Sequence, residues 1–187
     1  MRQSRYDFHP ITESEAREAI VWQYTPPQDY YNLDPAPDKQ AQHLAYYLNP
    51  HHQIYSVTNV EGRFLACASF GRDARVAGAD YALAGGDVPL DFGLWLNPSL
   101  VGSGLGYRIC VAQLDFARAT FGARHFRATI ADFNSAPQRV VMTLGFNAVQ
   151  HFAAKQRGEI FQVFVRFDNP LIKLKYHTLN LKQPSNQ

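Results

Sequence analysis

Cysteine is scarce in this chain: only Cys67 and Cys110 occur among the 187 residues, and each stands alone in an apolar segment. Two isolated cysteines cannot form the dense disulfide framework of a small secreted domain or a cysteine-based metal site. Seven histidines are present, but none shows the spacing of a metal-ligand motif, and the pair His51 and His52 is more typical of a loop. We therefore predict reduced core cysteines and no metal.

Long apolar runs and charge clusters are also missing. No stretch approaches the ~18 apolar residues of a membrane-spanning helix, and the N-terminus lacks the apolar core of a signal peptide. The formal net charge is +2, from 18 basic and 16 acidic residues, and the lysines and arginines are dispersed. We therefore expect a cytoplasmic protein that binds neither nucleic acid nor membrane.

Apolar residues are abundant enough for one sizeable core. Hydrophobic residues make up 46% of the chain and aromatic residues 13%, which argues against a disordered protein. We expect a single domain over residues 1–170 and a C-terminal tail over 171–187. The alternation of apolar and polar residues from Ile172 to His177 suits either an extended arm or a frayed terminus.

The spacing of apolar residues predicts alternating strands and helices. Strand-like runs occupy residues 6–10, 54–58, 64–70, 90–96, 124–130, 146–149 and 160–165. Helical spacing with start and stop signals covers 12–24, 41–48, 105–121 and 134–144, and a surface loop is expected at 72–87. This pattern predicts an α/β (α+β) fold, with a mixed sheet of six to seven strands covered on both faces by about four helices.

The turn between the strand at 90–96 and the helix at 105–121 carries glycine at positions 102, 104 and 106. Glycine allows backbone N–H groups to approach an anion closely, and the start of a helix adds unpaired donors. A strand, a glycine turn and a helix therefore predict a phosphate-binding turn. The alternative is a flexible turn with no ligand.

Two well-known phosphate loops do not match this turn. A P-loop requires Gly-Lys-Ser/Thr, but Leu105 and Tyr107 follow the second and third glycines. The dinucleotide fingerprint Gly-x-Gly-x-x-Gly would require glycine at Tyr107, and an acidic residue about 20 positions later, where Arg124 to Arg127 occur instead.

The segment Val101-Gly102-Ser103-Gly104-Leu105-Gly106 resembles the acetyl-CoA loop of the GNAT acetyltransferase superfamily, which is written Gln/Arg-x-x-Gly-x-Gly/Ala. Val101 departs from the usual Gln or Arg. A second family signature, an Asn that opens a helix ending in Gly-Phe, matches Asn134 and Gly145-Phe146. The resemblance implies a mostly antiparallel GNAT sheet, acetyltransferase activity and acetyl-CoA as the acyl donor.

The resemblance also implies which residues bind acetyl-CoA. Backbone amides from Val101 to Gly106 would bind the pyrophosphate, with Ser103 and Tyr107 at its edge. The pantetheine arm and the thioester would meet the backbone of Leu94, Trp95 and Leu96. Asn134 would hold the far side of that arm, although a plain helix cap is the alternative role for this residue.

The catalytic groups are less clearly marked. Asp91 lies on the strand where many family members carry a Glu that acts as a base. Strand alternation allows Asp91 either to line a cavity or to be buried with a charged partner. Where much of the family has a tyrosine acid, this chain has Val141, with Ser135 as a weaker substitute.

Family position places the acceptor site near residues 24–47, a segment that contains several tyrosines. Tyr30 and Tyr31 are the predicted substrate-binding residues, because aromatic walls suit an amine or an apolar side chain. We expect an N-acetyltransferase that transfers acetyl directly to a small primary amine or a peptide N-terminus. A catalytically weak CoA-binding module and an unrelated nucleotide-binding protein are the alternatives, and the formation of a homodimer stays open.

Overall fold

The computed structural model of the protein describes residues 5–79, 81, 88–155 and 158–168. The predicted tail at 171–187 and part of the predicted loop at 72–87 lie outside the described residues. Within the part that is described, no helix combines the length and the apolar character needed to cross a membrane.

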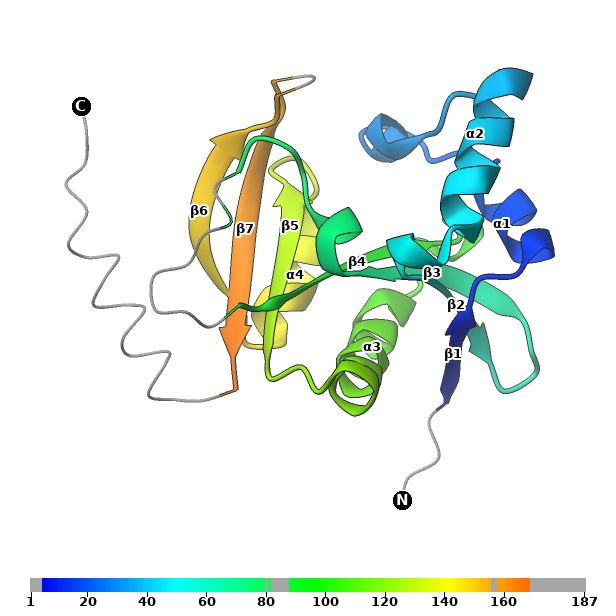
Figure 1. The fold of residues 1–187 in the computed structure, drawn as a ribbon. Coiled ribbons are helices and arrows are strands. Elements are labelled where there is room, and N and C mark those ends of the chain that lie inside the picture. The colour runs from blue at the N-terminus through cyan, green and yellow to red at the C-terminus, as the bar shows by residue number, and fades with distance from the viewer. Residues whose placement is uncertain (1–4, 80, 82–87, 156–157, 169–187) are drawn as a thin grey trace.

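Seven strands form one sheet in the order β1-β2-β3-β4-β5-β7-β6 (Figure 1). Neighbouring strands are antiparallel throughout, except for the parallel pair β4 and β5. The strands are β1 (Tyr6–Pro10), β2 (Ile54–Asn59), β3 (Phe64–Phe70), β4 (Leu90–Leu96), β5 (His125–Ala131), β6 (Asn147–Ala153) and β7 (Ile160–Phe167). The predicted mixed, mostly antiparallel sheet is therefore confirmed.

Among the described residues, four α-helices accompany the sheet: α1 (Glu13–Ala19), α2 (Pro37–Leu48), α3 (Leu105–Phe121) and α4 (Ser135–Thr143). Short 3-10 helices are η1 (Gln28–Tyr31), η2 (Pro50–His52), η3 (Gly71–Ala74) and η4 (Pro98–Leu100). The helix predicted to reach Tyr24 ends at Ala19 instead. The chain turns there, with the Trp22 N–H donating to the Ala19 carbonyl at 3.1 Å, and the Tyr24 N–H then donates to Asn32 Oδ1 at 2.7 Å. The second helix begins earlier than predicted, at Pro37, since proline is well tolerated at a first helical position.

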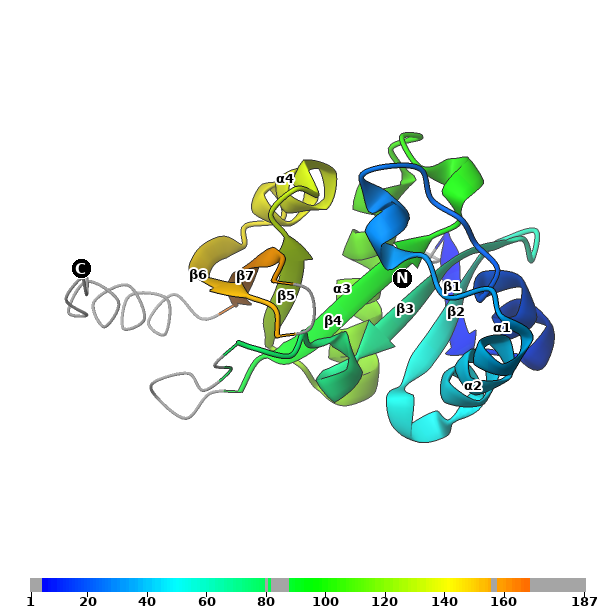
Figure 2. The same cartoon turned by 90° about the horizontal axis from the view of Figure 1, so that it is seen from above.

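Strand β3 is buried on both faces, and this places it at the centre of the domain. Ala66, Ala68 and Phe70 face the large cluster formed with α3, whereas Cys67 faces a second cluster formed with α1 and α2. Successive side chains of a strand point to opposite faces, so helices must cover both sides of β3. Figures 1 and 2 show α1 and α2 side by side, away from α3.

The parallel strands β4 and β5 pair over only two residues, Leu90 with Phe126 and Asp91 with Arg127. Beyond Asp91 the two strands diverge, as the ribbons show (Figure 1). Because β4 continues to Leu96 on β3 alone, one of its edges has no β5 partner there. This gap lies directly before the glycine turn.

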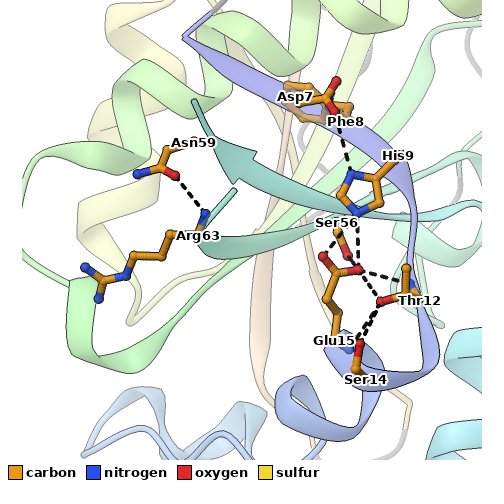
Figure 3. Close-up of polar contacts among 9 residues, drawn as sticks. All are labelled: Asp7, Phe8, His9, Thr12, Ser14, Glu15, Ser56, Asn59 and Arg63. Atoms are coloured by element: carbon orange, nitrogen blue, oxygen red, sulfur yellow. Dashed lines mark hydrogen bonds and ion pairs between the residues drawn. The ribbon is translucent and has the colours of Figure 1, made fainter. Parts of the chain in front are cut away.

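The start of α1 confirms the capping box predicted from Thr12 and Glu15. The Glu15 N–H donates to Thr12 Oγ1, and Thr12 N–H donates back to Glu15 Oε2 at 3.0 Å. Glu15 Oε2 also accepts from Ser56 Oγ on β2 at 2.8 Å, and Oε1 lies 3.0 Å from His9 Nε2 on β1 (Figure 3). One carboxylate therefore ties the helix start to two strands.

We expect Glu15→Gln to lower the free energy of unfolding by ~1–2 kcal/mol at neutral pH, since it removes the capping carboxylate. Burial alone would raise the pKa of Glu15, but the hydrogen bonds from Thr12 and Ser56 and the charge of His9 outweigh it and lower the pKa below 4.5. The stabilisation is therefore complete above that value and is lost as the pH falls through the folded-state pKa.

Urea unfolding at about pH 7 and about pH 3 measures this difference, which should shrink at the lower pH. Glu13→Gln is the matched control, because Glu13 lies on the same helix and is 62% exposed in its ion pair with Arg17. Glu13→Gln should change the free energy of unfolding by no more than ~0.5 kcal/mol. Equal effects at the two positions would contradict the role assigned to Glu15.

Candidate functional site

The glycine turn has an open backbone surface. Gly102 and Gly104 adopt left-handed conformations, with φ of +83° and +76°, and Gly104 is the N-cap residue of α3 without any side-chain cap. A Cβ at either position, or at Gly106, would meet no protein atom within 4 Å. The first N–H groups of α3 have no acceptor within the helix, so they are available to an anion.

A cleft of about 1000 Å³ runs from this turn into the gap between β4 and β5. It brings together eleven of the predicted binding residues from four separate segments: Tyr30, Tyr31, Leu94, Trp95, Leu96, Val101, Gly102, Gly104, Gly106, Tyr107 and Asn134. Ser103 and Leu105 do not line the cleft. The Ser103 hydroxyl donates to the Leu100 carbonyl at 2.6 Å, which holds the turn rather than a ligand.

Asn134 faces the cleft instead of capping its helix. It occupies the N-cap position of α4, but its side chain makes no capping hydrogen bond. Its Oδ1 accepts from Gln28 Nε2 at 3.4 Å, and its side chain also hydrogen-bonds to Tyr31. Burial raises the pKa of Tyr31, and the bonds to Asn134 and to the Ala131 backbone offset only part of that rise. The plain-cap alternative for Asn134 is therefore wrong.

Asp91, the candidate catalytic base predicted from the sequence, does not line the cleft. Its side chain is 1% exposed and lies against Arg127, which is equally buried. Asp91 Oδ1 accepts from Arg127 Nε at 2.5 Å, while Oδ2 accepts from Arg127 at 2.8 Å and from Arg75 Nε at 2.7 Å. Both oxygens are occupied by guanidinium groups, so the carboxylate is a structural ion-pair partner.

The ion pair is built where β4 and β5 still touch. Asp91 and Arg127 are paired across the two strands, and the Arg127 guanidinium also lies 4.6 Å from the centre of the Tyr81 ring. The Tyr81 hydroxyl in turn hydrogen-bonds to the backbone of Val76 and to Thr129. Tyr81, which belongs to the predicted surface loop, therefore packs against Arg127 and Thr129 of β5.

No hydroxyl occupies the position of the usual family acid. Val141 is buried at 3% exposure and lines the cleft with an apolar side chain. The predicted substitute, Ser135, accepts from Arg139 at 3.1 Å and is not among the cleft residues. Cys110 lines the cleft, but burial raises the pKa of its thiol to about 12, so the thiol is protonated at neutral pH.

A second cavity of about 240 Å³ adjoins the cleft. Five residues line both spaces: Tyr24, Tyr31, Ser69, Asp73 and Trp95. Sequence reasoning missed Ser69 and Asp73. Ser69 belongs to a strand that is apolar overall, and Asp73 lies in a glycine- and alanine-rich segment with no motif. Tyr24 lies in the segment 24–47 that was predicted to line the acceptor site, but no role was predicted for it. Its hydroxyl donates to the Leu96 carbonyl at 2.8 Å.

Charged groups are few in these two spaces. Asp73 is their only carboxylate among the described residues, and the cations in the cleft are Arg75 and Arg139. In the part of the chain that is described, no three His, Cys, Asp or Glu residues gather as a metal site would require. The arrangement suits an anion at the glycine turn and an uncharged or cationic group at the far end.

Comparison with known proteins agrees with this geometry. The family model of the GNAT acetyltransferase domain matches residues 2–147. None of the curated proteins matches significantly.

Solved structures with the same fold are numerous. A GNAT-family acetyltransferase from Bacillus anthracis has a TM-score of 0.63 at 14% identity, covering 88% of this chain and 95% of that one. A spermidine N-acetyltransferase chimera from Vibrio cholerae and hSSAT has a TM-score of 0.62 at 11% identity, covering 96% of this chain and 100% of that one. The protein yncA of Salmonella typhimurium, solved with acetyl-CoA, has a TM-score of 0.57 at 17% identity, covering 89% of this chain and 95% of that one.

The family match spans most of the chain, and it includes both the glycine turn and the start of α4 where Asn134 lies. The fold, with a parallel strand pair that separates in front of a glycine turn, agrees with that match. The chain therefore belongs to the GNAT superfamily of N-acetyltransferases.

Proposed function

We propose that the protein transfers an acetyl group from acetyl-CoA to a primary amine by direct attack. The observation that carries this proposal is the continuity of the two spaces. The cleft begins at the glycine turn, passes between β4 and β5, and meets an aromatic cavity at the residues Ser69 and Asp73. A donor entering from the turn and an acceptor in the cavity would therefore meet inside the sheet, which favours reaction by proximity.

The residues present fit acetyl-CoA as the donor. Open backbone amides at Gly102, Gly104 and Gly106 suit the pyrophosphate, and each charge-assisted bond contributes ~1.5–3 kcal/mol. The edge of β4 from Leu94 to Leu96, which has no β5 partner, would hold the pantetheine arm, with Asn134 opposite. The thioester supplies an activated acetyl group.

The transfer forms a C–N bond, breaks the C–S bond, and moves one proton from the amine to solvent or a base. Asp91 is unavailable for this step because two arginines occupy its oxygens. Asp73 lines both spaces and is the carboxylate best placed to attract the amine. A thiolate is a tolerable leaving group, so the reaction proceeds without a tyrosine at position 141.

Calorimetry with acetyl-CoA, CoA and ATP, followed by a thiol-release screen of primary amines, tests this function. Binding of both CoA compounds, with thiol release in the presence of an amine, is expected. Binding without release for any amine would favour a CoA-binding module, for which Val101 and Val141 are the motivating departures. Preference for ATP, or no CoA binding, would overturn both functions.

The pH profile of turnover gives an independent expectation. We expect a single rising limb from about pH 6 to about pH 9.5, since only the deprotonation of the amine or its base limits the rate. Burial, with a smaller effect of Cys67, raises the pKa of Tyr24 above its usual range, so this hydroxyl stays protonated throughout. A falling alkaline limb that persists in the folded enzyme would reveal an acid that Val141 cannot provide.

A further inference from the structure

The cavity of about 240 Å³ is closed mainly by aromatic rings from segments far apart in the sequence. Trp22 follows α1, Tyr46 and Tyr47 lie on α2, and Trp95 lies on β4. Leu33, from the loop between η1 and α2, completes one wall. For comparison, an engineered cavity of ~150 Å³ holds benzene. The space is therefore large enough for a phenyl ring or a somewhat larger aromatic group.

The carboxylate and the unpaired hydroxyl of this cavity lie at its junction with the cleft, whereas His43, whose buried Nε2 has no hydrogen-bond partner among the described residues, lines the cavity away from the junction. Ser69 is fully buried, lines both spaces, and its Oγ has no hydrogen-bond partner among the described residues. It lies opposite Gly93 on β4, where an added Cβ would come within 2.9 Å of Ser69 Oγ. Asp73, the other polar junction residue, has Oδ1 at 2.6 Å from the Tyr46 hydroxyl and 2.8 Å from His52 Nδ1.

The remainder of the cavity has no carboxylate, lysine or arginine among the described residues that line it. A second ammonium placed there would be desolvated without a counter-charge, which is costly. An aromatic ring placed there would instead gain ring contacts on several sides. The cavity thus favours an apolar ring, and only the junction favours an amine.

We propose that the acceptor is a primary amine joined through a short chain to an aromatic ring, and that the ring fills this side cavity while the nitrogen lies at Ser69 and Asp73. The proposal rests on the function proposed above and specifies its substrate class. The same lining disfavours a polyamine, because its second ammonium would have no carboxylate beside it among the described residues beyond the junction.

Rates of thiol release with 2-phenylethylamine, ethylamine and spermidine test the substrate class. The value of kcat/KM for 2-phenylethylamine should exceed that for ethylamine by at least ~100-fold, because one methylene in an apolar pocket already contributes ~10-fold or more. It should also exceed that for spermidine. Equal use of the three amines, or a preference for spermidine, would overturn the aromatic acceptor while leaving acetyl transfer intact.

Absence of thiol release with every amine, despite binding of acetyl-CoA, would refute the proposed function and this inference together. A dipeptide amide that begins with phenylalanine distinguishes the source of the ring. If kcat/KM for this dipeptide amide equals that for 2-phenylethylamine, the acceptor is a peptide N-terminus. A lower kcat/KM for the dipeptide amide would support a free arylalkylamine.

Leu33→Trp is the variant that fills the cavity, since Leu33 is partly exposed on a loop that can accommodate the larger side chain. We expect KM for 2-phenylethylamine to rise by ~10-fold or more, with little change for ethylamine and for acetyl-CoA affinity. Leu48→Trp is the matched control, because Leu48 is 37% exposed on α2 and lines neither space. An equal KM for 2-phenylethylamine in the unchanged protein, in Leu33→Trp and in Leu48→Trp would overturn the placement of the ring.

Discussion

Gly104→Val is expected to weaken acetyl-CoA binding by ~10- to 1000-fold, which corresponds to the loss of one or two charge-assisted amide contacts. The side chain would enter the open space in front of the turn, where no protein atom lies within 4 Å and where we place the pyrophosphate. Because the clash is with the ligand rather than with the protein, the variant should still unfold cooperatively. Calorimetry with acetyl-CoA measures the change.

The same helix offers a matched control. Gly122, the C-cap residue of α3, has φ of +65°, and a Cβ there would also meet nothing within 4 Å. Gly122→Val therefore introduces comparable backbone strain, of ~1–3 kcal/mol, at a position that does not line the cleft. It should lower stability and leave the affinity unchanged. If folded Gly104→Val protein binds acetyl-CoA normally, the pyrophosphate must lie elsewhere.

Asp91→Asn is expected to lower the free energy of unfolding by ~3–5 kcal/mol, the usual cost of breaking a buried ion pair. The change leaves the guanidinium of Arg127, at 1% exposure, without its full counter-charge. Turnover per folded molecule should change little, because Asp91 is outside the cleft. Urea unfolding and a thiol-release assay on the folded fraction measure the two effects separately.

A catalytic base at Asp91 would give the opposite pattern. Removing a general base typically lowers turnover by ~10²–10⁴-fold with little effect on stability. Asp115→Asn serves as the control for charge removal, since Asp115 is 70% exposed and pairs with Arg118 on the same helix. It should alter stability by no more than ~0.5 kcal/mol. A large loss of turnover in stable Asp91→Asn protein would show that the ion pair opens during catalysis.

The features that could be predicted from the sequence depend on contacts between near neighbours. The capping box of Thr12 and Glu15 closes over three residues. The glycine turn lies between strand β4 and helix α3, whose first residues are about fifteen positions apart. A local pattern of residues therefore suffices to predict its open backbone N–H groups. Most of the residues predicted from β4 and the turn line one cleft for this reason, whereas the Ser103 hydroxyl bonds back to the Leu100 carbonyl.

The features that could not be predicted depend on long-range register. Alternation allowed two environments for Asp91, and only the parallel pairing with Arg127, 36 residues away, decided between them. The cavity of about 240 Å³ has the same origin, since its walls come from α1, α2, η1, η3, three strands and the loops near α1 and η1. No periodicity within one segment encodes which rings will meet across such distances.

The sequence by itself determined the family, the order of strands and helices, and the glycine turn before α3. These follow from local backbone preferences and from apolar spacing, which are properties of short segments. Only the tertiary structure decided that Asp91 is an ion-pair partner, that Asn134 faces the cleft, and that Ser69 and Asp73 lie where the cleft and the smaller cavity meet. Those outcomes depend on sheet pairing and helix packing, which bring distant residues together.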